Sequence, residues 1–180
     1  RWVFSTSNST AYTLTVNGQF YMDAGTSLDI NRAASGSQAT TILANGDFYS
    51  FGSITETGNN IGSVIEFGGS TPANLGISPT ALSNNVSLRI NRTAPLLSDD
   101  VYMPNSPDAR LYLVNGNLDV LTNDALVYLN NPLPDALVGG TVNSHIIGRL
   151  ARKSGGTGTY DFPVSNNATQ LAMASITPAS

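Results

Sequence analysis

The sequence predicts an all-β protein, most simply a right-handed parallel β-helix (a β-solenoid) that ends in a β-hairpin. Three observations support this fold class. Helical periodicity is almost absent, apolar and polar residues alternate along many short runs, and one strand–turn–strand unit recurs along the chain. Hydrophobic residues make up 41% of the chain and charged residues only 11%, against roughly 25% charged in an ordinary soluble protein. Solubility must therefore come from Ser, Thr, Asn and Gly.

Two runs illustrate the alternation. In residues 85–91, Val86, Leu88 and Ile90 fall on one face of an extended chain, with polar residues between them. Residues 63–67 form a second short apolar run, with glycines on both sides. Both runs are typical of short strands that end in turn residues.

The recurring unit is a strand, an Asn-Gly pair and a second strand. It occupies residues 13–22, 41–50 and 111–120, which superpose without gaps. The apolar residues keep one inward phase on both sides of each pair. The pairs, which we expect to form structural corners, are Asn17-Gly18, Asn45-Gly46 and Asn115-Gly116.

Two architectures can use this unit. As a hairpin turn, Asn-Gly would build an antiparallel β-sandwich; as a corner, it would join the strands of stacked solenoid coils. The first two pairs are 28 residues apart (45 − 17) and the last two are 70 apart (115 − 45), which leaves room for two or three further coils. We favour the solenoid, and we expect the corner asparagines to form a ladder wherever their coils are neighbours.

The chain is expected to be one continuous unit and a fragment of a longer protein. Residues 1–94 would form solenoid coils, with 31–40 as a projecting loop. Residues 95–110 would be an irregular, proline-rich excursion, and 111–180 a further coil with a closing hairpin of strands 146–152 and 159–164. The expected interior residues are Val16, Phe20, Met22, Leu28, Phe48, Val86, Leu88, Ile90, Val114, Leu118, Val120 and Leu126.

Composition also limits the function. The chain has no Cys, so disulfides, thiolate metal sites and a cysteine nucleophile are excluded. A net charge of −4 argues against a nucleic-acid partner, which needs a broad basic face. No apolar run approaches the roughly 20 residues of a membrane helix, and the sequence has no phosphate-binding loop. We expect no membrane insertion, no cofactor and no metal.

The candidates for catalysis are few. Asp99-Asp100 is the only adjacent acidic pair, and it reads as a solvated turn between prolines. His145 is the only histidine, and it also reads as a turn residue. We assign no catalytic residue.

Two surface features remain. Tyr21 and Tyr49 hold the same place in their repeats, out of phase with Phe20 and Phe48, so stacked coils would align them on the outer face. Exposed aromatic rings of this kind can stack on sugar rings, and we regard the two tyrosines as a candidate glycan contact. The second feature, near the end of the chain, is a surface basic cluster of Arg149, Arg152 and Lys153.

Two motifs resemble the β-helical repeat regions of large secreted, adhesin-like surface proteins of Bacteroidota that the type IX system exports. One is the coil VNGQFYMDAGTSLDI, repeated as VNGNLDVLTNDALVYL; the other is the closing pattern of 146–152 (IIGRLAR) and 158–164 (GTYDFPV). Ser165 stands where the closing pattern usually has Gly, and no type IX sorting domain is evident.

The resemblance implies an exported, extracellular or cell-surface protein with a structural or adhesive role and no catalytic residue. We therefore expect a non-enzymatic, stiff scaffold whose partners are polysaccharides, other surface proteins or further copies of itself. The alternatives are a carbohydrate-active β-helix enzyme, a polysaccharide lyase or hydrolase, and a subunit of an extracellular filament.

Overall fold

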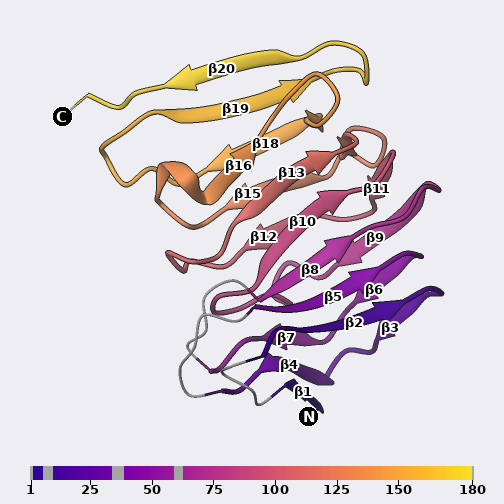
Figure 1. Cartoon of the computed structure of the whole chain (residues 1–180). Helices are drawn as coiled ribbons and strands as arrows, with labels where there is room; N and C mark the ends of the chain where they lie inside the picture. Colours follow the sequence, from indigo (N-terminus) through magenta and orange to yellow (C-terminus); the bar gives the residue numbers. More distant parts are fainter. Residues whose placement is uncertain (1, 6–9, 34–38, 59–62, 180) are drawn as a thin grey trace.

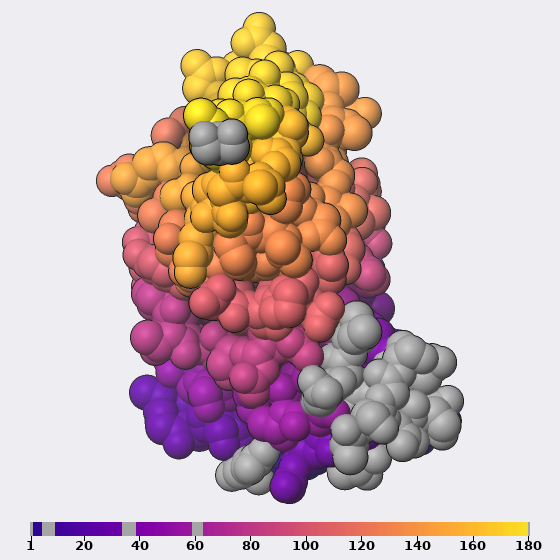
Figure 2. Space-filling model, turned by 90° about the vertical axis from the view of Figure 1, so that its left-hand side faces the viewer, coloured from indigo at the N-terminus to yellow at the C-terminus, as the bar shows by residue number. Residues whose placement is uncertain are grey.

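The computed structural model describes residues 2–5, 10–33, 39–58 and 63–179. The chain folds as a parallel β-solenoid of about five turns, as the sequence predicts. Figure 1 shows the coils stacked from the N-terminus at the bottom to the C-terminus at the top, and Figure 2 shows the resulting column from another side. Each turn places one strand on each of up to three sides of this column.

The first side is a six-stranded sheet in which all neighbouring strands are parallel. Its strands, in spatial order from the N-terminal end, are β2 (Tyr12–Val16), β5 (Thr40–Ala44), β8 (Val64–Phe67), β10 (Ser87–Asn91), β13 (Leu111–Asn115) and β16 (Leu137–Gly139).

The second side is an eight-stranded sheet, parallel up to its last pair. At the C-terminal end β20 runs antiparallel to β19 and reverses the direction of the sheet. Its strands are β3 (Phe20–Met22), β6 (Phe48–Ser50), β9 (Ala73–Ile77), β11 (Pro95–Leu97), β14 (Leu118–Asp119), β17 (Ile146–Ile147), β19 (Tyr160–Ser165) and β20 (Ala172–Ile176).

The third side consists of two three-stranded parallel sheets. A parallel bridge between Ile54 and Leu82 continues the first of them by one layer. A short 3-10 turn, η1 (Pro134–Ala136), precedes β16. The strands are β1 (Trp2–Ser5), β4 (Ser27–Asn31), β7 (Ser53–Thr55), β12 (Val101–Met103), β15 (Leu126–Leu129) and β18 (Arg149–Arg152).

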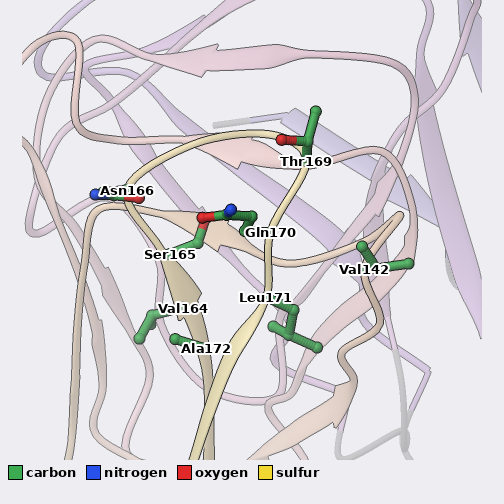
Figure 3. A pocket seen from close by; sticks show the side chains of 8 residues that line it. All are labelled: Val142, Val164, Ser165, Asn166, Thr169, Gln170, Leu171 and Ala172. Atoms are coloured by element: carbon green, nitrogen blue, oxygen red, sulfur yellow. The ribbon is translucent and has the colours of Figure 1, made fainter.

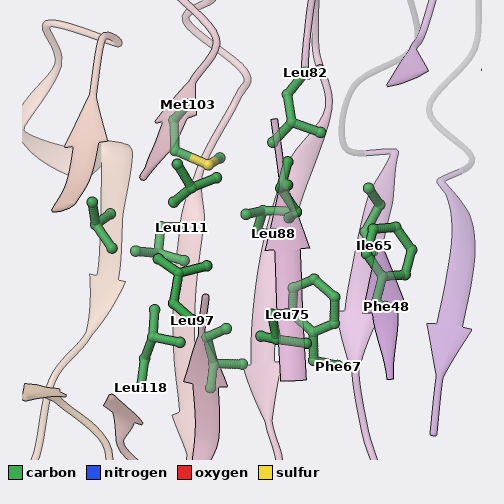
Figure 4. Packing of buried hydrophobic residues seen from close by; sticks show 14 of the residues in the cluster. Phe48, Ile65, Phe67, Leu75, Leu82, Leu88, Leu97, Met103, Leu111 and Leu118 are labelled. Carbon is green, nitrogen blue, oxygen red and sulfur yellow. The ribbon is translucent and has the colours of Figure 1, made fainter. Parts of the chain in front are cut away.

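The core runs along the axis of the column, and Figure 4 shows part of it, with buried side chains from successive strands packed together. Parallel register stacks equivalent side chains, so that Ile42, Ile65, Leu88 and Leu111 follow one another on the first side. Burying each of these side chains contributes about 1.5–3 kcal/mol. The runs at 63–67 and 85–91 contain β8 and β10, which belong to the two coils that separate the second and third repeats.

The predicted burial is wrong for two residues, Val114 and Leu126. Val114 is exposed at 54%, because the register slips by one residue there: Ile90 faces Leu113 while Asn91 faces Asn115. A single extra residue moves the inward phase to Leu111 and Leu113. Leu126 is likewise only half-buried, since its neighbour Val127 points into the core. The gapless match of the third repeat is therefore not its structural register.

The expected closing hairpin of strands 146–152 and 159–164 is also wrong. Residues 146–152 divide into β17 and β18, which lie on different sides of the column. The antiparallel partner of β19 is β20, so the hairpin that ends the chain spans residues 160–176. Local sequence cannot show this difference, because β18 pairs with β15, a distant segment.

The expected irregular excursion at 95–110 is in large part regular. It contains β11 and β12, which pair in parallel with β9 and β15 and complete an ordinary coil. Pro95 is accommodated at the first position of β11. The expected loop at 31–40 falls partly on residues 34–38, which lie outside the described residues.

The Asn-Gly pairs lie at the corner between the first and second sides. The side chain of Asn45 donates a hydrogen bond to that of Asn17 over 2.9 Å, which is the expected ladder between neighbouring coils. Asn115 lies beyond two intervening coils and is not part of this ladder. Layers approach closely here: a Cβ on Gly46 would lie 2.4 Å from the carbonyl oxygen of Gly18, whereas a Cβ on Gly18 would meet nothing within 4 Å.

Gly46→Ala is therefore expected to destabilise the protein by roughly 1–3 kcal/mol through overpacking of backbone against backbone. Gly18→Ala is the matched control at the same corner of the first coil, and it should be neutral or slightly stabilising. Thermal or denaturant unfolding of both variants measures the difference. Equal stabilities would contradict the layer contact at this corner.

Candidate functional site

The outer face of the second side carries an aromatic strip of Tyr21, Tyr49 and Phe51 near the N-terminal end. Tyr21 and Tyr49 face each other in register on β3 and β6, with ring centroids 6.5 Å apart. Phe51 follows β6 and meets the Tyr21 ring edge-on at 5.8 Å. Tyr21 is 55% exposed and Phe51 is 45% exposed, so the strip offers ring surface to solvent. The predicted outward alignment of the two tyrosines is confirmed.

A glycine in the next coil sets the tilt of this strip. Gly76 faces Tyr49 in the ladder, and a Cβ on Gly76 would lie 2.7 Å from Tyr49 Cδ1. The ring of Tyr49 therefore leans over Gly76, where any other residue would displace it. At the other end of the strip Thr26 donates its hydroxyl to the carbonyl of Asp23 over 2.6 Å. The strip thus combines exposed aromatic faces with nearby polar groups.

The three expected members of the basic cluster have different environments. Arg149 is exposed on β18 and pairs with Asp124 at 3.1 Å. Lys153 is exposed after the strand. Arg152 is half-buried, and its position corrects the prediction of a surface basic cluster.

Arg152 is a structural contact between the third side and the final hairpin. Its guanidinium donates to the carbonyl oxygens of Pro134 at 2.6 Å, Asp161 at 2.8 Å and Leu133 at 3.3 Å. It also lies 5.2 Å from the ring centroid of Tyr160. Desolvation by this burial lowers the pKa of Arg152, and the charge of Asp161 partly opposes the shift; the group stays protonated.

The acidic pair lies in a turn, and both carboxylates accept backbone N–H groups. Asp99 and Asp100 occupy the turn between β11 and β12. Asp99 Oδ1 accepts the backbone N–H of Asp100, and Asp100 Oδ1 accepts that of Leu126, each over 2.8 Å. Among the described residues no three His, Asp or Glu side chains gather closely enough to hold a metal ion. Asp99 thus caps a backbone group of its own turn, and Asp100 caps the first residue of β15.

The predicted turn is present at residues 142–143, directly before His145, but the imidazole itself is fully buried. Its Nδ1 lies 3.2 Å from the carbonyl of Thr141, and its Nε2 lies 2.8 Å from Ser165 Oγ and 3.1 Å from the carbonyl of Asn167. Ser165 Oγ also donates to that Asn167 carbonyl over 2.5 Å. The imidazole therefore ties the segment before β17 to the end of β19.

This Ser–His contact borders a hollow of about 730 Å³ between Val142 and the turn that joins β19 to β20 (Figure 3). A serine hydroxyl on an imidazole is the first half of a nucleophilic pair. In a catalytic triad a carboxylate would contact the other imidazole nitrogen, but here the Thr141 carbonyl lies at His145 Nδ1. The Ser165 hydroxyl is also closer to the Asn167 carbonyl than to His145 Nε2. The geometry is that of a tether between coil and hairpin.

Two buried polar features were not predicted from the sequence. The first is Arg92, fully buried at the corner after β10. It donates to the carbonyl oxygens of Thr71 and Gly46, each at 3.2 Å, and of Asn45 at 3.4 Å. Desolvation lowers the pKa of Arg92, and Asp47 partly offsets that shift. The only feature of the sequence that could have indicated this burial is the place of Arg92, two residues after an apolar β run.

The second feature is a set of buried polar residues at the corner after the third side. Each accepts a hydrogen bond from the backbone N–H two residues later, the pattern of an Asx-type turn. The sequence feature that could have indicated this set is a spacing of 25 residues, which separates the first two of its four members and also the last two. The acceptors are Asn31, Glu56, Ser106 and Asn131, and the donors are Ala33, Gly58, Asp108 and Leu133.

Arg152→Gln is expected to cost about 2–3 kcal/mol of unfolding free energy, because it leaves partly buried carbonyls without a charged donor. Arg149→Gln removes an exposed ion pair and should cost less than about 1 kcal/mol. Chemical denaturation of the two variants measures both values. A cost for Arg149→Gln as large as that for Arg152→Gln would count against this division of the cluster.

No protein-family model matches the chain, and neither a curated protein nor a solved structure matches it. Within the described part of the chain, no helix is long and apolar enough to cross a membrane. The likeness of the corner and closing motifs to Bacteroidota surface proteins stays a prediction.

Proposed function

We propose that this chain is a non-enzymatic structural and adhesive segment of a secreted bacterial cell-surface protein, acting as a stiff scaffold with a glycan contact. The observation that carries the proposal is the parallel stacking of successive coils around one core. Export and surface location rest on the composition and on the motif resemblance, and they belong to the proposal.

Stiffness follows from the direction of the hydrogen bonds. Each strand bonds to the layers above and below it, at a spacing of about 4.8 Å, so the backbone bonds run along the axis of the column. The bonding continues through corners: Asn45 N–H reaches the Val16 carbonyl over 2.8 Å, and Phe20 N–H reaches the Asp47 carbonyl over 2.9 Å. Bending the column would stretch several of these bonds at once.

The outer surface suits contact with uncharged polymers. Charged residues are few along the chain, and the aromatic strip presents ring faces next to hydroxyl and carbonyl groups. The apolar face of a pyranose ring packs on such rings without ion pairing. A polysaccharide is therefore the partner that we propose for Tyr21 and Tyr49.

The position of the acids supports a scaffold over a polysaccharide lyase or hydrolase. Such enzymes bring two carboxylates, or an acid and a base, to one substrate. Asp99 and Asp100 instead accept backbone N–H groups in one turn. His145 is buried against two carbonyl oxygens and a serine.

Replacing both Tyr21 and Tyr49 by Ala is expected to weaken binding to bacterial surface polysaccharide by at least tenfold. Two ring contacts at about 1 kcal/mol each amount to about 2 kcal/mol, and 1.4 kcal/mol is tenfold in Kd. Glycan-array screening followed by titration calorimetry gives the affinities.

The matched control replaces Tyr102 and Tyr128, whose rings also pair across neighbouring strands, at 5.5 Å on the third side. This double variant should bind glycan like the parent chain. Circular dichroism confirms that both variants are folded. Unchanged glycan binding after loss of Tyr21 and Tyr49 would refute the proposed contact.

A further inference from the structure

The N-terminal strand β1 stands in a layer of its own. It pairs in parallel with β4, and Trp2 faces Leu28 just as Leu28 faces Ile54 of β7 in the following layer. Along the chain, a layer contributes first a strand to the first side, then one to the second side and last one to the third side. The third-side strands β7, β12, β15 and β18 all follow this order. β1 therefore holds the third position of a layer beneath β2, β3 and β4 (Figure 1).

The first two positions of that layer are open within the described residues, and the side chains around them are mostly apolar, with Asp23 and Thr26 as polar neighbours. Trp2, Leu28 and Ile54 occupy one inward column, yet they are exposed at 75%, 9% and 0%. On the first side Leu14 is 36% exposed, whereas Ile42 opposite it is fully buried. A hollow of about 410 Å³ lies among Trp2, Phe4, Leu14, Phe20 and Met22.

We infer that this end is an open layer interface, and that the polypeptide directly preceding β1 occupies it with two parallel strands along β2 and β3. The contact would continue the interface that every pair of layers in the column already makes. The two edge strands carry no charged residue and no proline, the features by which exposed edges are usually protected. The occupant is thus an extended segment with alternating apolar residues, as in the other layers.

A second copy of the chain fits this end less well. At the C-terminal end β19 and β20 extend the second side beyond β17, while β16 and β18 end the other two sides (Figure 1). That end is uneven by two strands. A copy stacked head to tail would leave the hollow beside β2 unfilled.

The test adds a layer to the full chain. A duplicate of residues 40–52 is placed directly before Arg1, so that Arg1 takes the place that Ser53 holds after β6. We expect the melting temperature to rise by about 4 °C or more. Amide exchange in β2 and β3 should slow at least tenfold. Trp2 is the only tryptophan, so a shift of its emission to shorter wavelength reports burial of this end alone.

The matched control carries the same duplicate with its Ile42 and Phe48 both changed to Asp, which removes the inward apolar residues. It should leave melting, exchange and emission as in the 180-residue chain. Amide protection of β10 and β13 serves as the internal standard that each protein is folded. If the two extended chains behave alike, the inference is wrong.

Two further readouts test the occupant. Leu14→Ser should lower the melting temperature of the extended chain by several degrees more than that of the 180-residue chain, since Leu14 becomes a core residue only when covered. Light scattering on the 180-residue chain should give a monomer. A dimer with concentration-dependent protection of β2 would overturn the inference, because a second copy would then fill the end.

Discussion

The parallel hydrogen bonding of one layer to the next, in fixed register, is the constraint on which the rest of the structure depends. It stacks each residue on its equivalent one coil later. The rings of Phe20 and Phe48 therefore stack almost parallel inside the column, with their centroids 4.5 Å apart, while Tyr21 and Tyr49 meet outside it. The same constraint brings backbone close to backbone at the corners, which is why Gly46 lies against Gly18.

Much of the coil could be predicted from the sequence, because its determinants are local. Alternation identified β8 and β10, and the Asn-Gly repeat identified the corner where Asn45 bonds to Asn17. The outward place of Tyr21 and Tyr49 followed from their phase relative to Phe20 and Phe48. In these cases residues a few positions apart carry the information.

The errors arise where distant segments decide. Val114 looked like an interior residue until the one-residue slip against β10 turned it outward. Residues 146–152 looked like one strand, because nothing local shows that β17 and β18 pair with different partners. Arg152 looked solvated and His145 looked like an ordinary turn residue, yet both contact carbonyl groups of other segments. Charge and polarity alone do not indicate which side chains satisfy buried backbone groups.

The antiparallel strand β20 has a consequence for the direction of assembly. A parallel coil acts as a template, since its exposed edge has the polarity that the next coil must match. β20 reverses that polarity on the second side, so a further coil laid on it would meet a ladder of the opposite sense. The two ends of the column therefore differ: the strands at the β1 end all keep the direction of the coils, whereas at the other end the last strand of the second side runs the opposite way.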